Sequence, residues 1–545
     1  MQKLRNHPIL ILLIVNILVG LLTFRDYGLS WDEPLFYDYA DALRYAYSPK
    51  EWFSGNFNLE NAYGSSGTDH ANRGPAYIII ARPFVSIVEA LGADNASAWH
   101  LINFLTFQLG VYLLYRLTRR YVSDSAALAS AALFAWQPLL WGHAFINPKD
   151  MPFLVFFLGA VCFGFEMADE IGTRTSVENT EGFPKNQRSS AFISVPIKLL
   201  LASFFLGVAT SIRVLGPLAG LLVGIYALGK INKVALPALI KTFAAYAIIV
   251  VLVALATWPY LWTNPPQKFI QVFSFMSGNP TQLPVLFNSR IYIAGELPRR
   301  YLPMLLALTL SEPVWPLFVI GLGVASYKLQ VTSYASRISR SASINTDYRL
   351  PITEYLSLLL WFFIPFAYVL LRRPPMYDGY RHFLFILPPL FIFAGFAIEK
   401  IFNQLSITNY QLPIAFILLA PALYASLQLH PYQYAYYNSF IGGASGAFRK
   451  YETEYWLTCY KEAVEKFDQT NVNLFVKREP YIAAYYADKN ISIRDYRAEF
   501  GKIQSGDFVL VNTRTNEDVK TFRDAPVVLQ IRRGDAVFCE VKKIP

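Results

Sequence analysis

Length, composition and charge exclude an ordinary soluble protein. The chain has 545 residues, of which 54% are hydrophobic and only 16% are charged, whereas soluble domains carry about 25% charged residues. The formal net charge of +10 suggests a nucleic-acid partner, but the basic residues flank apolar runs, so they explain membrane orientation first. We therefore expect an integral membrane protein made of helices, with no nucleic-acid partner.

The first apolar run sets the orientation of the whole chain. Pro8–Thr23 follows Lys3 and Arg5, and positive charge before a first helix keeps that end in the cytoplasm. No small-residue cleavage site follows the run, so we interpret it as a retained helix and not as a signal peptide. The triplet Trp31-Asp32-Glu33 then emerges on the outer face, close to the bilayer surface.

The positive-inside rule predicts about eleven spanning helices, with the N-terminus inside and the C-terminus outside. The stretch Tyr77–Leu91 contains Arg82, Pro83 and Glu89, which are costly in mid-bilayer, so we expect it to lie flat on the outer surface. A mixed-charge segment over residues 169–198 predicts a flexible cytoplasmic loop. After Pro8–Thr23, the expected spans are Ala98–Tyr115, Ala126–Trp141, Pro152–Ala168, Leu199–Ser211, Val214–Leu228, Pro237–Thr257, Ser311–Tyr327, Glu354–Leu371, Phe383–Ile398 and Gln411–Leu429.

The apolar character drops from about Tyr451 onward. A helical stretch, Glu452–Phe467, precedes β-rich runs that Gly and Asp turns separate, namely Val472–Val476, Phe508–Val511 and Val527–Ile531. The predicted fold is thus mainly α, with a transmembrane helical bundle over residues 1–430. Residues 431–545 form an extracytoplasmic segment with a small α/β domain. Cys459 and Cys539 lie in this region, and whether they pair stays open.

Several charged residues on the predicted outer face are not needed for orientation. They are Asp32, Glu33, Arg73, Lys149, Asp150, Arg213, Arg372, Arg373 and Arg381. Acidic and basic groups that meet at one interface suggest a site that handles an anion beside a proton transfer. Plainer roles stay open, since Asp32 and Asp150 also occupy helix-cap positions, and Arg372 and Arg373 can bind interfacial lipid phosphates. No metal site is predicted, because His70 lacks neighbours at ligand spacing.

Five motifs, taken in order, resemble the GT-C membrane glycosyltransferases, and among them the protein O-mannosyltransferase and lipid A aminoarabinose transferase superfamily. They are Ser30-Trp31-Asp32-Glu33, Arg73-Gly74-Pro75-Ala76-Tyr77, Asn147-Pro148-Lys149-Asp150, Ser211-Ile212-Arg213-Val214-Leu215-Gly216-Pro217 and the stretch Tyr380–Pro389. The chain departs from the family at Arg73-Gly74, where a Lys or His followed by Pro is usual, and at Arg213, where Lys is usual. These departures put the phosphate contacts in doubt, because Arg and Lys differ in geometry.

The resemblance implies transfer of one sugar from a polyprenyl-phosphate carrier to an acceptor hydroxyl on the outer face of a bacterial inner membrane, with inversion. Asp32, with Glu33 second, would be the base. Arg73, Arg213 and Arg381, supported by Arg372 and Arg373, would bind the donor lipid phosphate, while Lys149 and Asp150 orient donor or acceptor. The partners would be membrane lipids, the donor, and an acceptor glycolipid, polysaccharide or protein. No cofactor is predicted with certainty, and a need for a divalent metal stays open.

Two other functions remain open at this point. A transporter or flippase for a lipid-linked sugar would need the same helices and cations, although transporter charges lie near the midplane between repeats. A membrane-anchored binding protein could act through its C-terminal domain, although about eleven helices are excessive for an anchor. A last aromatic stretch, with Tyr432, Tyr436 and Tyr437 among its residues, fits either sugar stacking or an interfacial belt.

Overall fold

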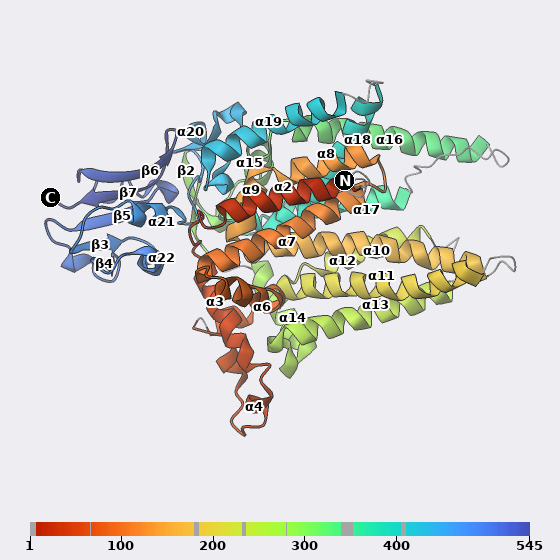
Figure 1. The fold of residues 1–545 in the computed structure, drawn as a ribbon, viewed down its shortest axis with the longest axis horizontal. Coiled ribbons are helices and arrows are strands. Elements are labelled where there is room, and N and C mark those ends of the chain that lie inside the picture. Colours follow the sequence, from red (N-terminus) through yellow and green to blue (C-terminus); the bar gives the residue numbers. More distant parts are fainter. Residues whose placement is uncertain are drawn as a thin grey trace.

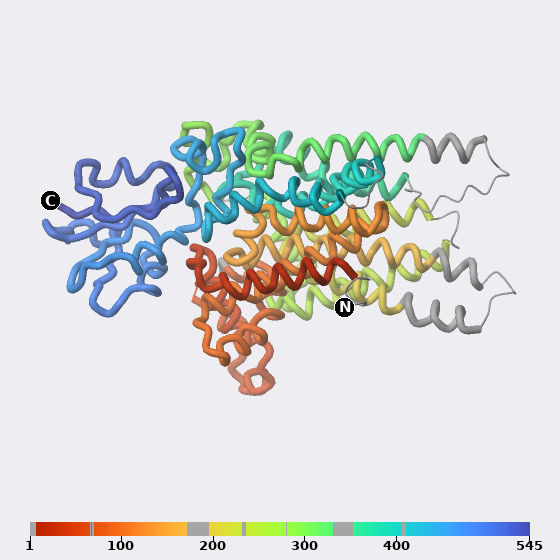
Figure 2. The backbone as a smooth tube through the Cα atoms, turned by 45° about the horizontal axis from the view of Figure 1, so that its top comes forward, coloured from red at the N-terminus to blue at the C-terminus, as the bar shows by residue number. Residues whose placement is uncertain are grey.

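The computed structural model describes residues 7–65, 67–178, 185–230, 236–278, 281–338, 352–404 and 410–545. Most helices run side by side along the long axis of the molecule, and the C-terminal sheet lies at one end of this bundle (Figures 1 and 2). At that same end, the segment that carries α4 (Pro49–Trp52) projects sideways (Figure 1). The bundle and the sheet thus meet at one face.

The bundle consists of long helices and several shorter ones. They are α2 Pro8–Thr23, α7 Asn95–Thr118, α8 Asp124–Ala135, α9 Pro138–Ile146, α10 Asp150–Glu178, α11 Lys185–Ile212, α12 Pro217–Leu228, α13 Leu236–Thr257, α15 Tyr301–Thr309, α16 Val314–Ile338, α17 Ile352–Arg372, α18 Pro388–Gln404 and α19 Gln411–Leu429. Among the residues that the structure describes, four helices, α10, α13, α17 and α19, are long and apolar enough to cross a membrane, and α15 with α16 form a fifth candidate, bent by 104°. This supports an integral membrane protein, while the predicted number of about eleven spans and their orientation stay predictions.

Two predicted spans and one predicted loop differ from the structure. The span Ala126–Trp141 is two helices, α8 and α9, because Pro138 opens α9 and Gln137 before it takes an extended backbone. The loop over residues 169–198 is helical at both ends, since an existing helix extends at low cost, and residues 179–184 lie outside the described part. The span Phe383–Ile398 starts as the 3₁₀ segment η6 (Arg381–Ile386), and α18 begins at Pro388.

Short elements lie at the end of the bundle near the sheet. They are α3 Glu33–Ala42, α5 Thr68–Ala71, α6 Ala76–Ala90, α14 Pro265–Gly278, the hairpin strands β1 Pro284–Phe287 and β2 Arg290–Ile293, and the 3₁₀ segments η1 Leu43–Tyr45, η2 Leu59–Ala62, η4 Pro259–Thr263 and η5 Ala294–Glu296. The helix predicted over Tyr77–Leu91 is confirmed as α6. Its position flat on a membrane surface remains a prediction.

The C-terminal region forms a mixed five-stranded sheet in the order β4-β3-β5-β7-β6. Strand β3 is parallel to β4 and β5, whereas β7 is antiparallel to β5 and β6. The elements are η8 Gln433–Ala435, η9 Ser439–Ile441, α20 Gly443–Ala447, α21 Cys459–Glu465, β3 Val472–Val476, α22 Pro480–Tyr486, β4 Ile491–Asp495, η10 Phe500–Lys502, β5 Phe508–Asn512, η11 Arg514–Asn516, β6 Val527–Arg533 and β7 Ala536–Lys543. The division of the chain after residue 430 stays a prediction.

All three predicted strands are confirmed, but the predicted helix Glu452–Phe467 is wrong over its first half. Leu457 has a φ of +65°, which a continuous helix cannot accommodate, so α21 begins only at Cys459. Cys459 and Cys539 are both buried, and neither forms a disulfide.

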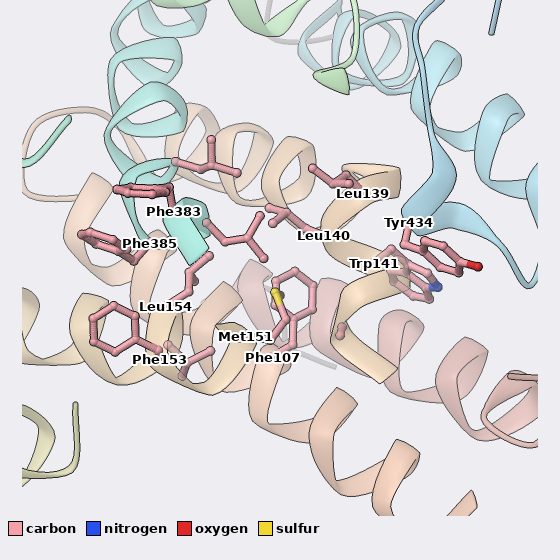
Figure 3. Packing of buried hydrophobic residues seen from close by; sticks show 14 of the residues in the cluster. Phe107, Leu139, Leu140, Trp141, Met151, Phe153, Leu154, Phe383, Phe385 and Tyr434 are labelled. Carbon is pink, nitrogen blue, oxygen red and sulfur yellow. The ribbon is translucent and has the colours of Figure 1, made fainter. Parts of the chain in front are cut away.

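Buried aromatic packing fixes the parts of the bundle that carry the candidate site. Figure 3 shows residues of α9, α10 and η6 in one apolar cluster. The rings of Phe153 and Phe385 meet edge to face, with centroids 5.1 Å apart, a geometry that aromatic pairs favour. Each of these residues stands only a few positions after a charged one, Asp150 and Arg381. The core therefore holds these two charged residues close together.

Candidate functional site

Arg381, at the start of η6, is the centre of a buried charge cluster. Its side chain is only 5% exposed, and its guanidinium lies 2.5 Å from Asp32 Oδ2, 3.2 Å from Asp378 Oδ2 and 3.8 Å from Asp150 Oδ2. The Trp456 ring stacks on the guanidinium, with its centroid 4.5 Å from Cζ. Residues separated by hundreds of positions thus form one site.

Asp32 precedes α3, but its side chain does not cap that helix. The alternative of a capping role is therefore wrong for this carboxylate, which pairs with Arg381 instead. Burial by itself would raise the pKa of Asp32, but the positive charges of Arg381 and Arg73 outweigh that effect and lower the pKa below its usual value. Asp32 is accordingly ionised at neutral pH.

Glu33 is directed away from the arginines. Its carboxylate accepts a hydrogen bond from the Ser30 backbone N–H at 2.6 Å and another from the Tyr37 hydroxyl, and His100 Nε2 lies 3.1 Å away. The bond from the Ser30 N–H ties the loop before α3 to Glu33, the first residue of that helix. The geometry thus gives Glu33 a role in holding the start of α3, beside the predicted base.

Asp150 opens α10 and pairs with Arg213, which follows α11. Asn147 supplies the cap of α10, since its Oδ1 accepts from the backbone N–H of Asp150 at 2.8 Å and of Lys149 at 3.2 Å. The alternative in which Asp150 is the cap is therefore wrong. Asn147 also donates to Asp150 Oδ2 at 3.0 Å, which fixes the carboxylate between Arg213 and Arg381.

One predicted phosphate ligand and one predicted orienting residue have no carboxylate partner among the described residues. Arg73 and Lys149 form no ion pair with any residue that the structure describes, although Arg73 is close enough to lower the pKa of Asp32. Burial, followed by the positive charges of Arg213 and Arg73, lowers the pKa of Lys149. An anion bound between these basic side chains would offset their mutual repulsion and favour the charged form of Lys149, so this side of the cluster suits a phosphate.

Gly74 explains how Arg73 reaches the Arg213 turn. A Cβ atom at this position would lie 1.3 Å from the Ser211 carbonyl oxygen, so the two backbones touch. We expect Gly74→Ala to separate the two turns, to cost about 1–3 kcal/mol of stability and to reduce binding of a polyprenyl phosphate. Gly224→Ala is the matched control, because a Cβ there meets nothing within 4 Å. Equal melting temperatures and binding for both variants would contradict this account.

Arg372 and Arg373 do not join the cluster. Both are exposed near the end of α17, and the Arg373 guanidinium donates to the carbonyls of Leu297 and Glu296, at 3.3 and 3.4 Å. Neither residue has a described contact with Asp32 or Arg381. Their predicted support of the donor phosphate thus remains a proposal for a lipid headgroup at the surface.

Sequence reasoning missed three charged residues of the site. Asp378 is fully buried beside Arg381, Arg514 is 2% exposed, and Glu452 is 5% exposed. The Asp378-Gly379 turn directly before Arg381 was a usable signal, since Asp-Gly marks a tight turn. Nothing local marks Arg514 or Glu452, because each reaches the site only through the tertiary fold.

A small cavity lies beside Arg381, and six of its fifteen lining residues are tyrosines. Tyr436 and Tyr437 of the predicted aromatic stretch are among its walls, together with Glu452 and His143. Burial raises the pKa of Glu452 to about 7, so this carboxyl group is partly protonated near neutral pH. Within the described residue ranges, no group of three or more His, Cys, Asp or Glu side chains is placed to hold a metal ion.

No family profile and no curated protein sequence matches the chain. Among solved structures, it is similar to ArnT from Cupriavidus metallidurans bound to undecaprenyl phosphate, with 13% identity and a TM-score of 0.47 over 98% of this chain and 97% of ArnT. It is also similar to the oligosaccharyltransferase AglB from Archaeoglobus fulgidus in complex with an inhibitory peptide and a dolichol-phosphate, with 11% identity and a TM-score of 0.48 over 93% of this chain and 70% of AglB. These values are too low to support an argument about activity.

Proposed function

We propose that the chain is a membrane glycosyltransferase that moves one sugar from a polyprenyl-phosphate carrier to an acceptor hydroxyl, with inversion. The observation that carries the proposal is one ionised carboxylate, Asp32, held by Arg381 beside two basic side chains, Arg73 and Lys149, that have no described ion-pair partner. A base and an anion site at one face of a helical bundle are what this reaction requires.

The proposed step is a single displacement. The acceptor oxygen attacks the anomeric carbon, the bond from that carbon to the phosphate oxygen breaks, and its electron pair leaves with the lipid phosphate. Asp32 takes the acceptor proton. Arg73, Lys149, Arg213 and Arg381 stabilise the negative charge that develops on the leaving phosphate.

The ion pair of Asp32 with Arg381 implies that the donor binds before Asp32 acts as a base. A carboxylate whose pKa is lowered by an arginine is a weak base. A donor phosphate that binds Arg381 draws the guanidinium away from Asp32 and thereby raises the proton affinity of Asp32. The base then becomes effective only when the donor is bound.

The test is to incubate the purified full-length protein with a panel of polyprenyl-phosphate sugars and candidate acceptors, and to measure released polyprenyl phosphate by mass spectrometry. We expect release that depends on both donor and acceptor. Movement of an intact lipid-linked sugar across proteoliposomes without release of lipid phosphate would favour the flippase and overturn the transferase.

Arg73 offers a test of the phosphate site at little risk to folding. Because it pairs with no described residue, Arg73→Met should leave the melting temperature unchanged, while binding of a polyprenyl phosphate weakens about 10-fold, as for one lost charge-assisted contact. The double change with Lys149→Met should weaken binding further. Arg299→Met, at an exposed arginine before α15, is the control. Binding that Arg73→Met leaves intact would remove Arg73 from the phosphate site.

A further inference from the structure

Arg514 belongs to the C-terminal region, at the start of η11, yet its side chain reaches the candidate site. Its Nη2 lies 2.7 Å from Asp378 Oδ1, and its Nε lies 3.5 Å from Glu452 Oε1. Its guanidinium also lies over the ring of Trp31, 5.3 Å from the ring centroid, next to the predicted base. A row of alternating charges therefore runs from Arg514 through Asp378 and Arg381 to Asp32.

Arg514 is the second cation beside Asp378, in addition to Arg381. Arg381 faces three carboxylates, but Arg213 pairs with Asp150 and Arg514 pairs with Asp378. Asp32 is therefore the main ion-pair partner of Arg381. Without Arg514, the fully buried Asp378 would have Arg381 as its remaining described ion-pair partner. An unpaired buried charge is costly, so Arg381 would shift toward Asp378 and away from Asp32.

We propose that Arg514 is a positioning residue of the glycosyl-transfer site, which balances Asp378 so that Arg381 stays available to Asp32 and to the donor phosphate. This inference rests on the proposed function. It also makes the C-terminal region part of the site, in agreement with other contacts. The Trp31 backbone N–H donates to the Trp456 carbonyl at 3.1 Å, and the Tyr481 hydroxyl donates to the Trp31 carbonyl at 3.0 Å.

The first measurement is binding of a short-chain polyprenyl phosphate to the purified full-length protein. Arg514→Met should weaken binding about 10-fold, because Arg381 turns toward Asp378. Arg449→Met is the matched control. Arg449 lies 2.7 Å from the buried Asp518 and has no described contact with Asp378, so binding should stay within about two-fold of wild type.

The second measurement is the pH profile of kcat/KM for sugar transfer, which a purely structural role of Arg514 would not change. When Arg381 moves away, the pKa of Asp32 rises, so the acidic limb should move to higher pH by about one unit. Arg449→Met should leave the limb in place. The charged and titratable groups that face Asp32 are Arg381, Arg73, Asp150, Asp378, Lys149, His70 and Tyr481.

Two further variants separate positioning from folding. Asp378→Asn combined with Arg514→Met removes both charges and should restore binding to within about three-fold of wild type. Arg514→Lys keeps the charge but cannot contact both Asp378 and Glu452. Its affinity for polyprenyl phosphate should therefore lie between those of wild type and Arg514→Met. If Arg514→Met fails to fold, phosphate binding and the acidic limb of the pH profile are measured for Arg514→Lys and for the double variant instead.

The outcomes separate this inference from the proposed function. Wild-type protein that neither binds polyprenyl phosphate nor releases it from a donor overturns the proposed function. Wild-type protein that does both, with Arg514→Met and Arg449→Met indistinguishable in binding and in the pH limb, overturns only the role of Arg514. Weakened binding with a shifted limb in Arg514→Met alone supports it.

Discussion

Asp32→Asn is expected to abolish sugar transfer while the protein stays folded and still binds polyprenyl phosphate. The amide keeps the size and one acceptor of the carboxylate but cannot take the acceptor proton, so kcat should fall by about 10²–10⁴-fold. Released lipid phosphate, measured at saturating donor, reports the loss. Asp41→Asn is the matched control, because Asp41 lies on α3 and pairs with Arg82 at 2.6 Å, outside the site.

The pH dependence of the wild type adds a second test of Asp32. Its pKa is lowered in the folded protein, so its stabilising ion pair is present above the unfolded pKa of about 3.9 and is lost as the pH falls through the folded pKa. The acidic limb of kcat/KM, which reports the free enzyme, should lie at low pH. The limb of kcat should lie higher, because bound phosphate draws Arg381 away. Coincident limbs would contradict the ordered activation of Asp32.

Arg381→Lys is expected to reduce kcat/KM by about 10²–10³-fold. Arg381 donates a hydrogen bond to Asp32 through Nη1 and forms an ion pair with Asp378 through Nη2 at 3.2 Å, and the single ammonium of a lysine cannot reproduce both contacts. Arg381→Met should in addition destabilise the fold by about 3–5 kcal/mol, since it leaves buried carboxylates without their cation. Thermal unfolding in detergent measures that loss.

The control for Arg381 is Arg82→Lys. Arg82 also contacts two carboxylates, Asp41 at 2.6 Å and Glu89 at 2.8 Å, but lies on α6 outside the cluster. Its replacement should leave transfer unchanged. If Arg381→Lys and Arg82→Lys both transfer sugar at the wild-type rate, the contact of one arginine with two carboxylates is not needed for the reaction.

Local signals in the sequence were sufficient for much of the fold. Apolar runs of membrane length, and Pro and Gly at their ends, predicted helices such as α13 and α19 and the helix α6. β-branched runs between Gly and Asp turns predicted β3, β5 and β6. The errors arose where one position overrides a pattern, as Pro138 does between α8 and α9, and as the positive φ of Leu457 does before α21.

The candidate site also has features that local signals predicted and features that they did not. Charges out of place for membrane orientation are visible residue by residue, and they predicted Asp32, Asp150, Arg213 and Arg381, which the structure brings into one cluster. The sequence also grouped Glu33 with Asp32. The structure separates the two, because adjacent residues at the start of a helix point in different directions.

Hydropathy and charge act locally, so the residue pattern was enough to predict a helical membrane protein with a small C-terminal sheet and a set of charges that membrane orientation does not need. Which of these charges pair with one another depends on the three-dimensional fold. Asp32 and Arg381 are 349 positions apart, and Arg514 reaches Asp378 from another part of the fold. Coulomb energies depend on distances in space and on burial, and neither can be obtained from spacing along the chain.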